Sequence, residues 1–495
     1  MKDGKDTKDL KDTWRMEPAG PGHGLIRAMK PLLLLALLTA LPAASLELKP
    51  CKLPDFGREA RCGTYEVFEN RAAAAGRKIA LRVVVIPASG TPVEPDPIVY
   101  FEGGPGGSAV ESGPGLTEEL AAALRNRDLV LIDVRGSGSL RCPKPNVEDA
   151  LDTFMDSAGC REALARDHDL AQYTTDALVD DVHELVSNLG YAKVNLLGAS
   201  YGTRAALVFL RRHPERVRTV HLHSVLPLDA RVPMFLAPHT QAAFDKMAVA
   251  CAAEPACHAA FPDPKADLQA VLSRLQAAPA EVPVRDEEHK ERTLRLSRNA
   301  AAQTVRYLLY RPAGARGLPH LLRLAAAGNL EPLAQAAHDI GAAMLASAPG
   351  GLYLSVTCAE DVAFVDPAEA ARLAEGTFMG GFRLQQQLAA CKEWPAAKVP
   401  AGFLEPVRSS VPVLIYAGEN DPATPLEWAQ KVAQTLPGSR ILAVPGGAHV
   451  FYGLPGVECL DRVYADFLAR GTAEGLDLET CRKSIRPLPF LTGFE

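Results

Sequence analysis

The sequence lacks any apolar run long enough to cross a bilayer, which takes about 20 residues, because its longest run, Leu32–Leu41, is roughly half that length. It has no long block of like charge, and a net charge of -6 over 495 residues gives no polycationic surface for nucleic acid. It also has no Cys-x-x-Cys pair, zinc-spaced Cys/His cluster or Gly-Lys-Ser/Thr phosphate loop. We therefore predict no metal, no organic cofactor, no nucleic-acid partner and no permanent membrane span.

Residues 29–45 have the layout of a signal peptide. Arg27 and Lys30 precede the apolar run, and Pro42 with the small residues Ala43 to Ser45 follows it. A basic entry and a small-residue exit favour export over a buried core helix, so we expect a secreted or periplasmic protein. Residues 1–28 are rich in Lys and Asp, which predicts disorder there or a start codon placed too early.

All ten cysteines follow the predicted signal peptide. An even number of cysteines in an exported chain favours disulfides. Because their spacing is clustered, we predict pairing between sequential neighbours, namely Cys51–Cys62, Cys142–Cys160, Cys251–Cys257, Cys358–Cys391 and Cys459–Cys481.

Short, continuously apolar runs alternate with helical patterns along much of the chain, as in a parallel sheet whose strands are buried on both faces. The predicted strands are Lys78–Pro87, Pro97–Phe101, Asp128–Val134, Val194–Leu197, Val217–His221, Val411–Tyr416 and Arg440–Val444. The predicted helices between them are Thr117–Arg125, Thr175–Leu189 and Thr203–His213.

The strand pattern stops between residues 229 and 409, where Ala-, Leu- and Arg-rich helical segments dominate. We therefore predict a core in two parts, 46–228 and 410–495, with a helical cap domain inserted at 229–409. Within the insert, the charged stretch Glu281–Arg292 predicts a solvated loop.

The sequence Gly198-Ala199-Ser200-Tyr201-Gly202 lies directly after a predicted strand and directly before a predicted helix. A nucleophile at such a sharp turn needs small residues two positions before and after it, because a Cβ there would collide with neighbouring backbone. The following helix N-terminus stabilises developing negative charge. Ser200 is therefore the predicted nucleophile of a serine hydrolase.

Two later strands run into loops with candidate partners for this serine. Asp421 follows the strand at Val411–Tyr416, and His449 follows the strand at Arg440–Val444. The chain order Ser, Asp, His and the shared sheet edge predict a catalytic triad. Glu419 is the alternative acid.

Four segments together resemble the proline iminopeptidase and tripeptidyl aminopeptidase family of secreted serine peptidases. They are Glu102 to Gly107, Asp133 to Ser139, Gly198 to Thr203 and Gly418 to Pro425. The resemblance spans most of the chain from about Cys51, and Cys391-x-x-Trp394-Pro395 resembles the family's C-terminal region. It implies an α/β-hydrolase fold, with a mostly parallel doubly wound sheet and an inserted helical cap.

The resemblance also implies residue roles. The backbone N–H groups of Gly104 and Tyr201 would form the oxyanion hole. Cap carboxylates bind the substrate amine in this family, which indicates Glu360 and, second to it, Asp361. A solvated acidic turn or an acid at a helix N-terminus is the alternative interpretation. Glu102 stands where proline iminopeptidases usually carry His, which argues against strict prolyl specificity.

We expect a serine aminopeptidase that removes residues or short peptides from free N-termini through an acyl-enzyme. A carboxylic ester hydrolase with the same triad is the alternative, because specificity lies in the cap. A non-catalytic binding protein is disfavoured because all three triad positions are filled. Haloalkane dehalogenases and epoxide hydrolases are disfavoured because they need Asp at the position of Ser200.

Overall fold

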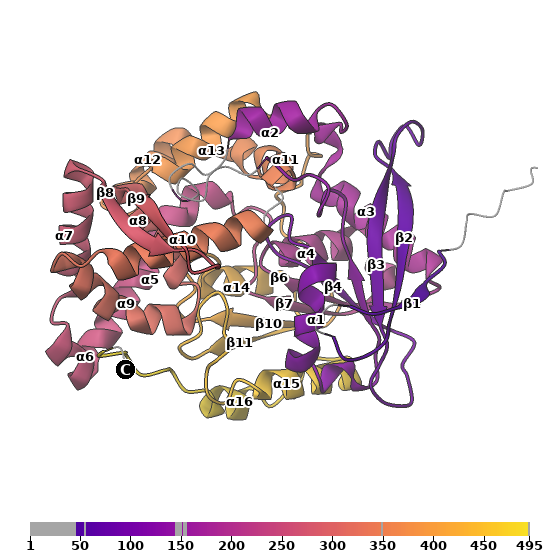
Figure 1. The fold of residues 1–495 in the computed structure, drawn as a ribbon. Helices are drawn as coiled ribbons and strands as arrows, with labels where there is room; N and C mark the ends of the chain where they lie inside the picture. Colours follow the sequence, from indigo (N-terminus) through magenta and orange to yellow (C-terminus); the bar gives the residue numbers. More distant parts are fainter. Residues whose placement is uncertain (1–45, 54–55, 144–150, 152–155, 348–349, 494–495) are drawn as a thin grey trace, which may run out of the picture. The chain divides into compact units, whose positions relative to one another are not determined.

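The computed structural model describes residues 46–495 except for 54–55, 144–150, 152–155, 348–349 and 494–495. The predicted signal peptide and the segment before it lie outside the described residues. In the described part of the chain, a nine-stranded sheet forms the centre, with the strand order β1-β2-β3-β5-β4-β6-β7-β10-β11 (Figure 1).

The strands from β5 to β11 in this order run parallel, as the continuously apolar runs predict. Every residue of β4, β5 and β10 is buried. The parallel strands are β4 Ile98–Phe101, β5 Leu129–Ile132, β6 Val194–Ala199, β7 Val217–His223, β10 Val413–Gly418 and β11 Ser439–Val444. An antiparallel extension precedes them, formed by β1 Lys49–Cys51, β2 Ala60–Phe68 and β3 Lys78–Ile86.

Helices pack on both faces of the sheet and bury two separate apolar clusters. One cluster includes α3 Thr175–Asn188 and α4 Tyr201–Arg212, and the other includes α1 Ala109–Glu119 and α15 Cys459–Arg470. Leu178, Val182 and Leu185 form a buried stripe on α3, and Leu189 at its end is partly buried. Gly190 ends this helix with a φ of +84°, a conformation that favours glycine. The other helices outside the insert are α2 Ser157–Leu164, α14 Leu426–Ala433 and α16 Leu478–Ser484.

The first helix differs from its prediction at Thr117–Arg125. Helix α1 begins earlier, where the Ser108 side chain accepts a hydrogen bond from the Glu111 N–H and caps the helix. It ends at Glu119, and a separate 3₁₀ turn follows at Ala123–Arg125. Gly113, Pro114 and Gly115 lie within α1, so the apolar periodicity that reveals a helix is weak in its first half.

The segment between β7 and β10 is mainly helical and has its own apolar cluster. Figure 1 shows α7, α8 and α9 beside one another in this segment. We call residues 229–409 the cap segment. Its helices are α5 Val232–Ala253, α6 Pro255–Ala260, α7 Pro264–Ala277, α8 Arg298–Leu308, α9 Pro312–Ala326, α10 Glu331–Ser347, α11 Gly350–Glu360, α12 Pro367–Ala374 and α13 Phe382–Glu393.

The predicted loop at Glu281–Arg292 is wrong. The chain forms an antiparallel hairpin there, with β8 Ala280–Arg285 paired to β9 Glu291–Leu296. Val282, Val284, Leu294 and Leu296 are buried, whereas the charged residues between them face solvent. This two-residue alternation is typical of a sheet with one solvent-exposed face. It is hard to recognise in the sequence because most of the residues are charged.

All five predicted cysteine pairs are confirmed as disulfides. Disulfides are rare in reducing compartments, so five of them indicate that the chain folds in an oxidising one. In the part of the chain that the structure describes, no single helix combines the length and the apolar composition of a membrane span. One bent pair of helical segments, Glu331–Leu345 and Gly350–Phe364, has the length and composition of a span when both segments are taken together, and nothing else marks it as one.

Candidate active site

The predicted triad residues and the glycine-rich loop follow strands whose carboxyl ends meet at one edge of the sheet. Ser200 follows β6, Asp421 follows β10 and His449 follows β11, whereas the glycine-rich loop at 102–107 follows β4. In open parallel sheets, ligands bind at this edge. The topology therefore brings together four segments that are far apart in the sequence.

Ser200 lies in a strained backbone conformation between β6 and α4, with a φ of 54° and a ψ of -121°. Its N–H donates to the His223 carbonyl over 2.9 Å, which ties the turn to the end of β7. A Cβ on Gly202 would lie 1.9 Å from the Phe101 carbonyl oxygen, and one on Gly198 would lie 2.4 Å from the Gly202 carbonyl oxygen. The turn thus requires glycine on both sides of the serine, as the motif predicts.

Asp421 and His449 are in direct contact. The His449 Nδ1 lies 2.9 Å from one carboxylate oxygen of Asp421 and 3.1 Å from the other. Asp421 also accepts hydrogen bonds from the N–H groups of Ala423 and Thr424 and from the Thr424 hydroxyl, at 2.7, 2.9 and 2.7 Å. These bonds satisfy a carboxylate that is only 4% exposed.

The electrostatics keep Asp421 ionised. Burial alone would raise its pKa, but the charge of His449 and the hydrogen bonds from His449 and Thr424 outweigh burial and hold the pKa of Asp421 below its ordinary value. An ionised carboxylate at Nδ1 fixes the imidazole tautomer, so that Nε2 is left to accept a proton.

The end of β7 links Ser200 with His449. The His223 carbonyl accepts from the Ser200 N–H, and the hydroxyl of the next residue, Ser224, donates to the His449 carbonyl over 2.8 Å. Ser200 and His449 line the same cavity, whose volume is about 1060 Å³. That volume lies just above the range of about 300–1,000 Å³ that is usual for ligand sites, so the cavity has room for a short peptide.

The alternative acid, Glu419, points elsewhere. Its carboxylate pairs with Arg482 over 3.0 Å and is about one-third exposed. Asp421 is therefore the carboxylate in contact with His449.

The loop at 102–107 lies against the serine. A Cβ on Gly103 would lie 3.2 Å from the Ser200 Cβ, and Gly104 has a φ of +117°. Asp133, from the second segment of the family resemblance, accepts from the Ser108 hydroxyl over 2.8 Å and from the Val110 N–H over 3.1 Å. It therefore fixes the start of α1 and, through it, the end of the glycine-rich loop.

The two carboxylates at the end of α11 occupy different environments. Asp361 lines the cavity and pairs with Arg204, whose two terminal nitrogens lie 2.8 and 3.0 Å from its oxygens. Glu360 lies behind it, completely buried, where it accepts from the N–H and the hydroxyl of Thr175 over 2.6 Å each. Neither of them is a solvated turn residue.

The Glu360 carboxyl should make folding stability depend on pH. Burial raises its pKa to about 7, although Arg204 and Thr175 act in the opposite direction. A carboxyl group whose pKa rises on folding stabilises the native state fully at low pH, and this contribution is lost as pH rises toward 7. We expect Glu360→Gln to remove a decline on the order of 3 kcal/mol between pH 4.5 and 8, since one pKa unit corresponds to about 1.4 kcal/mol. Urea unfolding of both proteins at the two pH values measures it, and an equal decline in both would contradict the assignment.

Sequence reasoning missed several residues around the triad. The Thr424 hydroxyl lies 3.2 Å from the His449 Nδ1 in addition to its bond with Asp421. Tyr310, from the cap segment, packs its ring edge-on to His449 with the ring centres 4.9 Å apart. Thr424 lies within the quoted motif at Gly418 to Pro425, but no local signal connects Tyr310 with a histidine so far along the chain.

The cavity also has an acidic lining, which the sequence did not reveal. Glu119 belongs to it, and its Oε2 is buried with no hydrogen-bond partner among the described residues. Burial raises the pKa of Glu119. Apart from Asp361, the carboxylates that line the cavity are Glu102, Glu111, Glu118, Glu119, Glu458 and Asp461.

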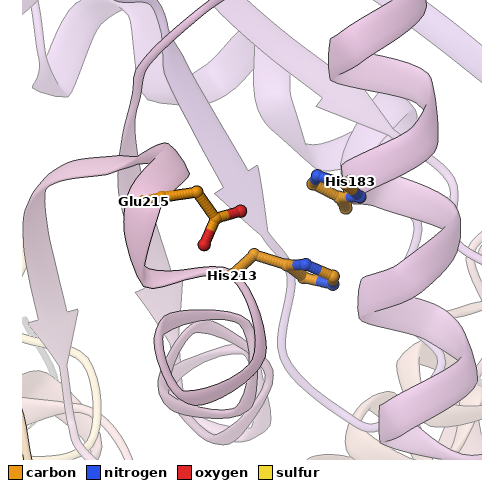
Figure 2. Close-up of side chains that lie close together, drawn as sticks. All are labelled: His183, His213 and Glu215. Carbon is orange, nitrogen blue, oxygen red and sulfur yellow. The ribbon is translucent and has the colours of Figure 1, made fainter.

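A group of three potential metal ligands lies outside the cavity lining. Figure 2 shows His183 on α3 with His213 and Glu215 on the segment after α4. The two imidazole rings are stacked 3.9 Å apart and almost parallel, and the Arg216 Nε donates to the His183 Nε2. Lone pairs lie in the ring planes, so stacked rings do not direct them at one ion, and Arg216 adds positive charge. This geometry favours a structural stack, and the absence of a metal stays a prediction.

Comparisons with known proteins find relatives that match most of the chain. The chain is 25% identical to "Serine protease Hip1" of Mycobacterium tuberculosis, with 83% of this chain and 86% of the relative covered. It is 26% identical to the "Tripeptidyl aminopeptidase" of Streptomyces lividans, with 87% and 85% covered. Among solved structures, the proline iminopeptidase of Mycobacterium smegmatis is 18% identical, with a TM-score of 0.40 and coverage of 82% of this chain and 98% of that one.

These relatives confirm the expected resemblance to tripeptidyl aminopeptidases. A family model described as the alpha/beta hydrolase fold matches residues 96–454, which include β4, β6, β10 and β11 and the loops that follow them. The chain belongs to the α/β-hydrolase fold family.

Proposed function

We propose that the protein is an exported serine aminopeptidase in which Ser200 is the nucleophile, His449 the general base and Asp421 the acid that orients it. The observation that carries the proposal is the contact between Asp421 and His449 beside the same cavity that Ser200 lines. Its enzyme class follows from the relatives, since proteins named serine protease and tripeptidyl aminopeptidase match most of the chain. The chain is a serine hydrolase of the peptidase type.

The proposed reaction has two halves. In the first, the Ser200 oxygen bonds to the substrate carbonyl carbon, His449 takes the hydroxyl proton, and this proton passes to the leaving nitrogen as the C–N bond breaks. In the second, water attacks the acyl-enzyme ester, again through His449, and Ser200 regains its proton. The backbone N–H groups of Tyr201 and Gly104 are the proposed donors to the oxyanion.

Recognition of a free N-terminus requires negative charge inside the cavity. The acidic lining supports this requirement, because a substrate ammonium that leaves water needs a carboxylate partner. Within that lining, the unpartnered oxygen of Glu119 is the strongest candidate. The assignment of the amine to Glu360 and Asp361 stays a prediction, and Arg204 already neutralises Asp361.

Export is the part of the proposal that depends on residues 29–45. The five disulfides support it, because the chain requires an oxidising compartment to form them. N-terminal sequencing of the exported protein checks it, with a start near Leu46 as the expected result.

A substrate comparison separates the aminopeptidase from the ester hydrolase. We expect a tripeptidyl arylamide with a free N-terminus to be cleaved with a kcat/KM at least about thirtyfold above that of its N-acetylated form, because loss of a desolvated charge pair costs roughly 2 kcal/mol or more. Equal rates on both arylamides, with faster cleavage of short acyl esters, would establish the ester hydrolase instead.

Variants in the same assay locate the amine partner. Glu119→Gln should reduce the preference for the free N-terminus, and Glu360→Gln and Asp361→Asn belong in the same series. Glu405→Gln is a matched control, because this exposed carboxylate does not line the cavity. A preference lost only in the Glu360 or Asp361 variants would move the amine site to the end of α11.

A further inference from the structure

Two arginines from the cap segment lie buried in the wall of the cavity. Arg306 on α8 is 6% exposed, and Arg383 on α13 is 5% exposed. Arg306 has no ion-pair partner among the described residues, and its Nε is buried without a hydrogen-bond acceptor. Burying a guanidinium with an unsatisfied N–H donor lowers the stability of the fold unless an anion accepts its hydrogen bonds and balances its charge.

Among the residues that the structure describes, aromatic rings and not carboxylates surround Arg306. The centre of its guanidinium lies 4.9 Å from the Tyr307 ring centre and 5.0 Å from that of Tyr310. One terminal nitrogen donates to the Tyr310 hydroxyl. Cation–π contacts of this kind offset part of the desolvation of the cation, but they supply no counter-charge.

The two carboxylates at the end of α11 are bonded to residues other than Arg306. Asp361 holds both terminal nitrogens of Arg204, and Glu360 is bonded to Thr175. Arg383 is a second buried cation in the cavity wall. Burial, and to a smaller extent the charge of Arg306, lowers the pKa of the Arg383 guanidinium. This side of the cavity therefore holds two guanidinium groups, whereas the acidic lining contributes carboxylates to the same cavity.

Tyr310 connects Arg306 with the triad. Its ring packs on His449, and its carbonyl accepts from the N–H of Val450 over 3.0 Å, directly after the histidine. An anion bound to Arg306 would thus be separated from the proposed general base, His449, only by the Tyr310 side chain. A group at that distance belongs to a residue next to the scissile bond or to the end of a short substrate.

We propose that Arg306, with Arg383 as a second donor, forms a subsite for a carboxylate of the peptide substrate. A guanidinium recognises a carboxylate through paired, charge-assisted hydrogen bonds. The carboxylate comes from an acidic side chain or from the free C-terminus of a short peptide. This inference rests on the proposed peptidase function and adds to it a preference for peptide substrates that carry a carboxylate.

Binding to the Ser200→Ala protein tests the subsite without turnover. Four tetrapeptides with free N-termini and otherwise equal sequences serve as probes. One pair compares a C-terminal carboxylate with a C-terminal amide, and the other pair, both amidated, compares a Glu side chain with a Gln side chain. Titration calorimetry gives the ratio of Kd values within each pair, and this ratio identifies the source of the carboxylate.

We expect one pair to differ by about tenfold or more in favour of the carboxylate, and Arg306→Gln in the Ser200→Ala background to reduce that ratio to below about threefold. Arg306→Lys should retain an intermediate ratio, because it keeps the charge and loses the paired geometry. Arg372→Gln is the matched control, since this exposed arginine on α12 does not line the cavity. Its ratio should equal that of the parent.

Several outcomes would overturn the subsite. They are ratios near one for both pairs in the parent protein, a ratio that survives Arg306→Gln, and failure of all four peptides to bind. The parent ratios need no cap variant, so the subsite is testable even if Arg306→Gln does not fold. Peptide turnover by the wild-type enzyme is measured separately, so failure of the subsite and failure of the proposed function remain distinguishable.

Discussion

Replacing Ser200 by alanine is expected to lower kcat by about a millionfold, the size of effect seen when a triad nucleophile is removed. The hydroxyl is the atom that forms the acyl-enzyme, and no other group in the cavity replaces it. The change removes a single oxygen and leaves the turn intact, because the backbone bond from the Ser200 N–H to the His223 carbonyl does not involve the side chain. We expect the free energy of unfolding to change by less than about 1 kcal/mol.

A fluorophosphonate probe tests this prediction independently of the substrate. Wild-type protein should be labelled at Ser200, whereas the Ser200→Ala protein should not be labelled. Ser112→Ala is the matched control, because Ser112 lines the same cavity without lying at the turn. Labelling at Ser112, or residual labelling of the Ser200→Ala protein, would show that the nucleophile is a different residue.

Asp421→Asn is expected to lower kcat by about ten-thousandfold. The carboxylate accepts hydrogen bonds from Ala423, Thr424 and His449, and an amide has only one oxygen with which to accept them. The amide nitrogen would also favour the imidazole tautomer that leaves no lone pair at Nε2 to accept the serine proton. The loss should appear in kcat more than in KM, since the acid does not contact the substrate.

Glu419→Gln provides the contrast. Its carboxylate lies two residues away in the same loop but pairs with Arg482 at the surface, so we expect kcat to stay within about twofold of the wild-type value. Kinetics of both variants on one arylamide substrate decide between the two acids. A larger loss in Glu419→Gln than in Asp421→Asn would reverse the assignment.

The hairpin β8–β9 shows why sequence patterns fail in some places. Its buried face consists of only four aliphatic residues, each separated from the next by exposed residues that are mostly charged. The charged composition therefore predicts a loop, although the aliphatic residues follow the two-residue period of a strand. The C-terminal end of α11 illustrates a different limit. Glu360 and Asp361 are consecutive acids, and no local pattern distinguishes a carboxylate that is buried against Thr175 from one that faces a cavity.

Local sequence patterns were sufficient to predict the turn at the nucleophile, the parallel strands and the cysteine pairs. The turn at Ser200 needs Gly198 and Gly202 because their Cβ atoms would meet backbone within a few residues or on an adjacent strand. Continuous apolar runs identified the parallel strands, and clustered cysteines identified their own partners, since short loops close most readily. The order of Ser200, Asp421 and His449 along such strands placed all three at one edge of the sheet.

The residues that surround that edge come from parts of the chain that meet only in the folded protein. Arg204 and Asp361 are 157 positions apart, and Thr175 and Glu360 are 185 apart, yet each pair is in contact and buried. Whether a charge lies in water or against another charge depends on how the cap segment packs on the core, and this packing sums many weak contacts that no local window contains. For the same reason, only the fold reveals that Tyr310 lies on His449 and that Arg306 lines the cavity with no carboxylate partner among the described residues.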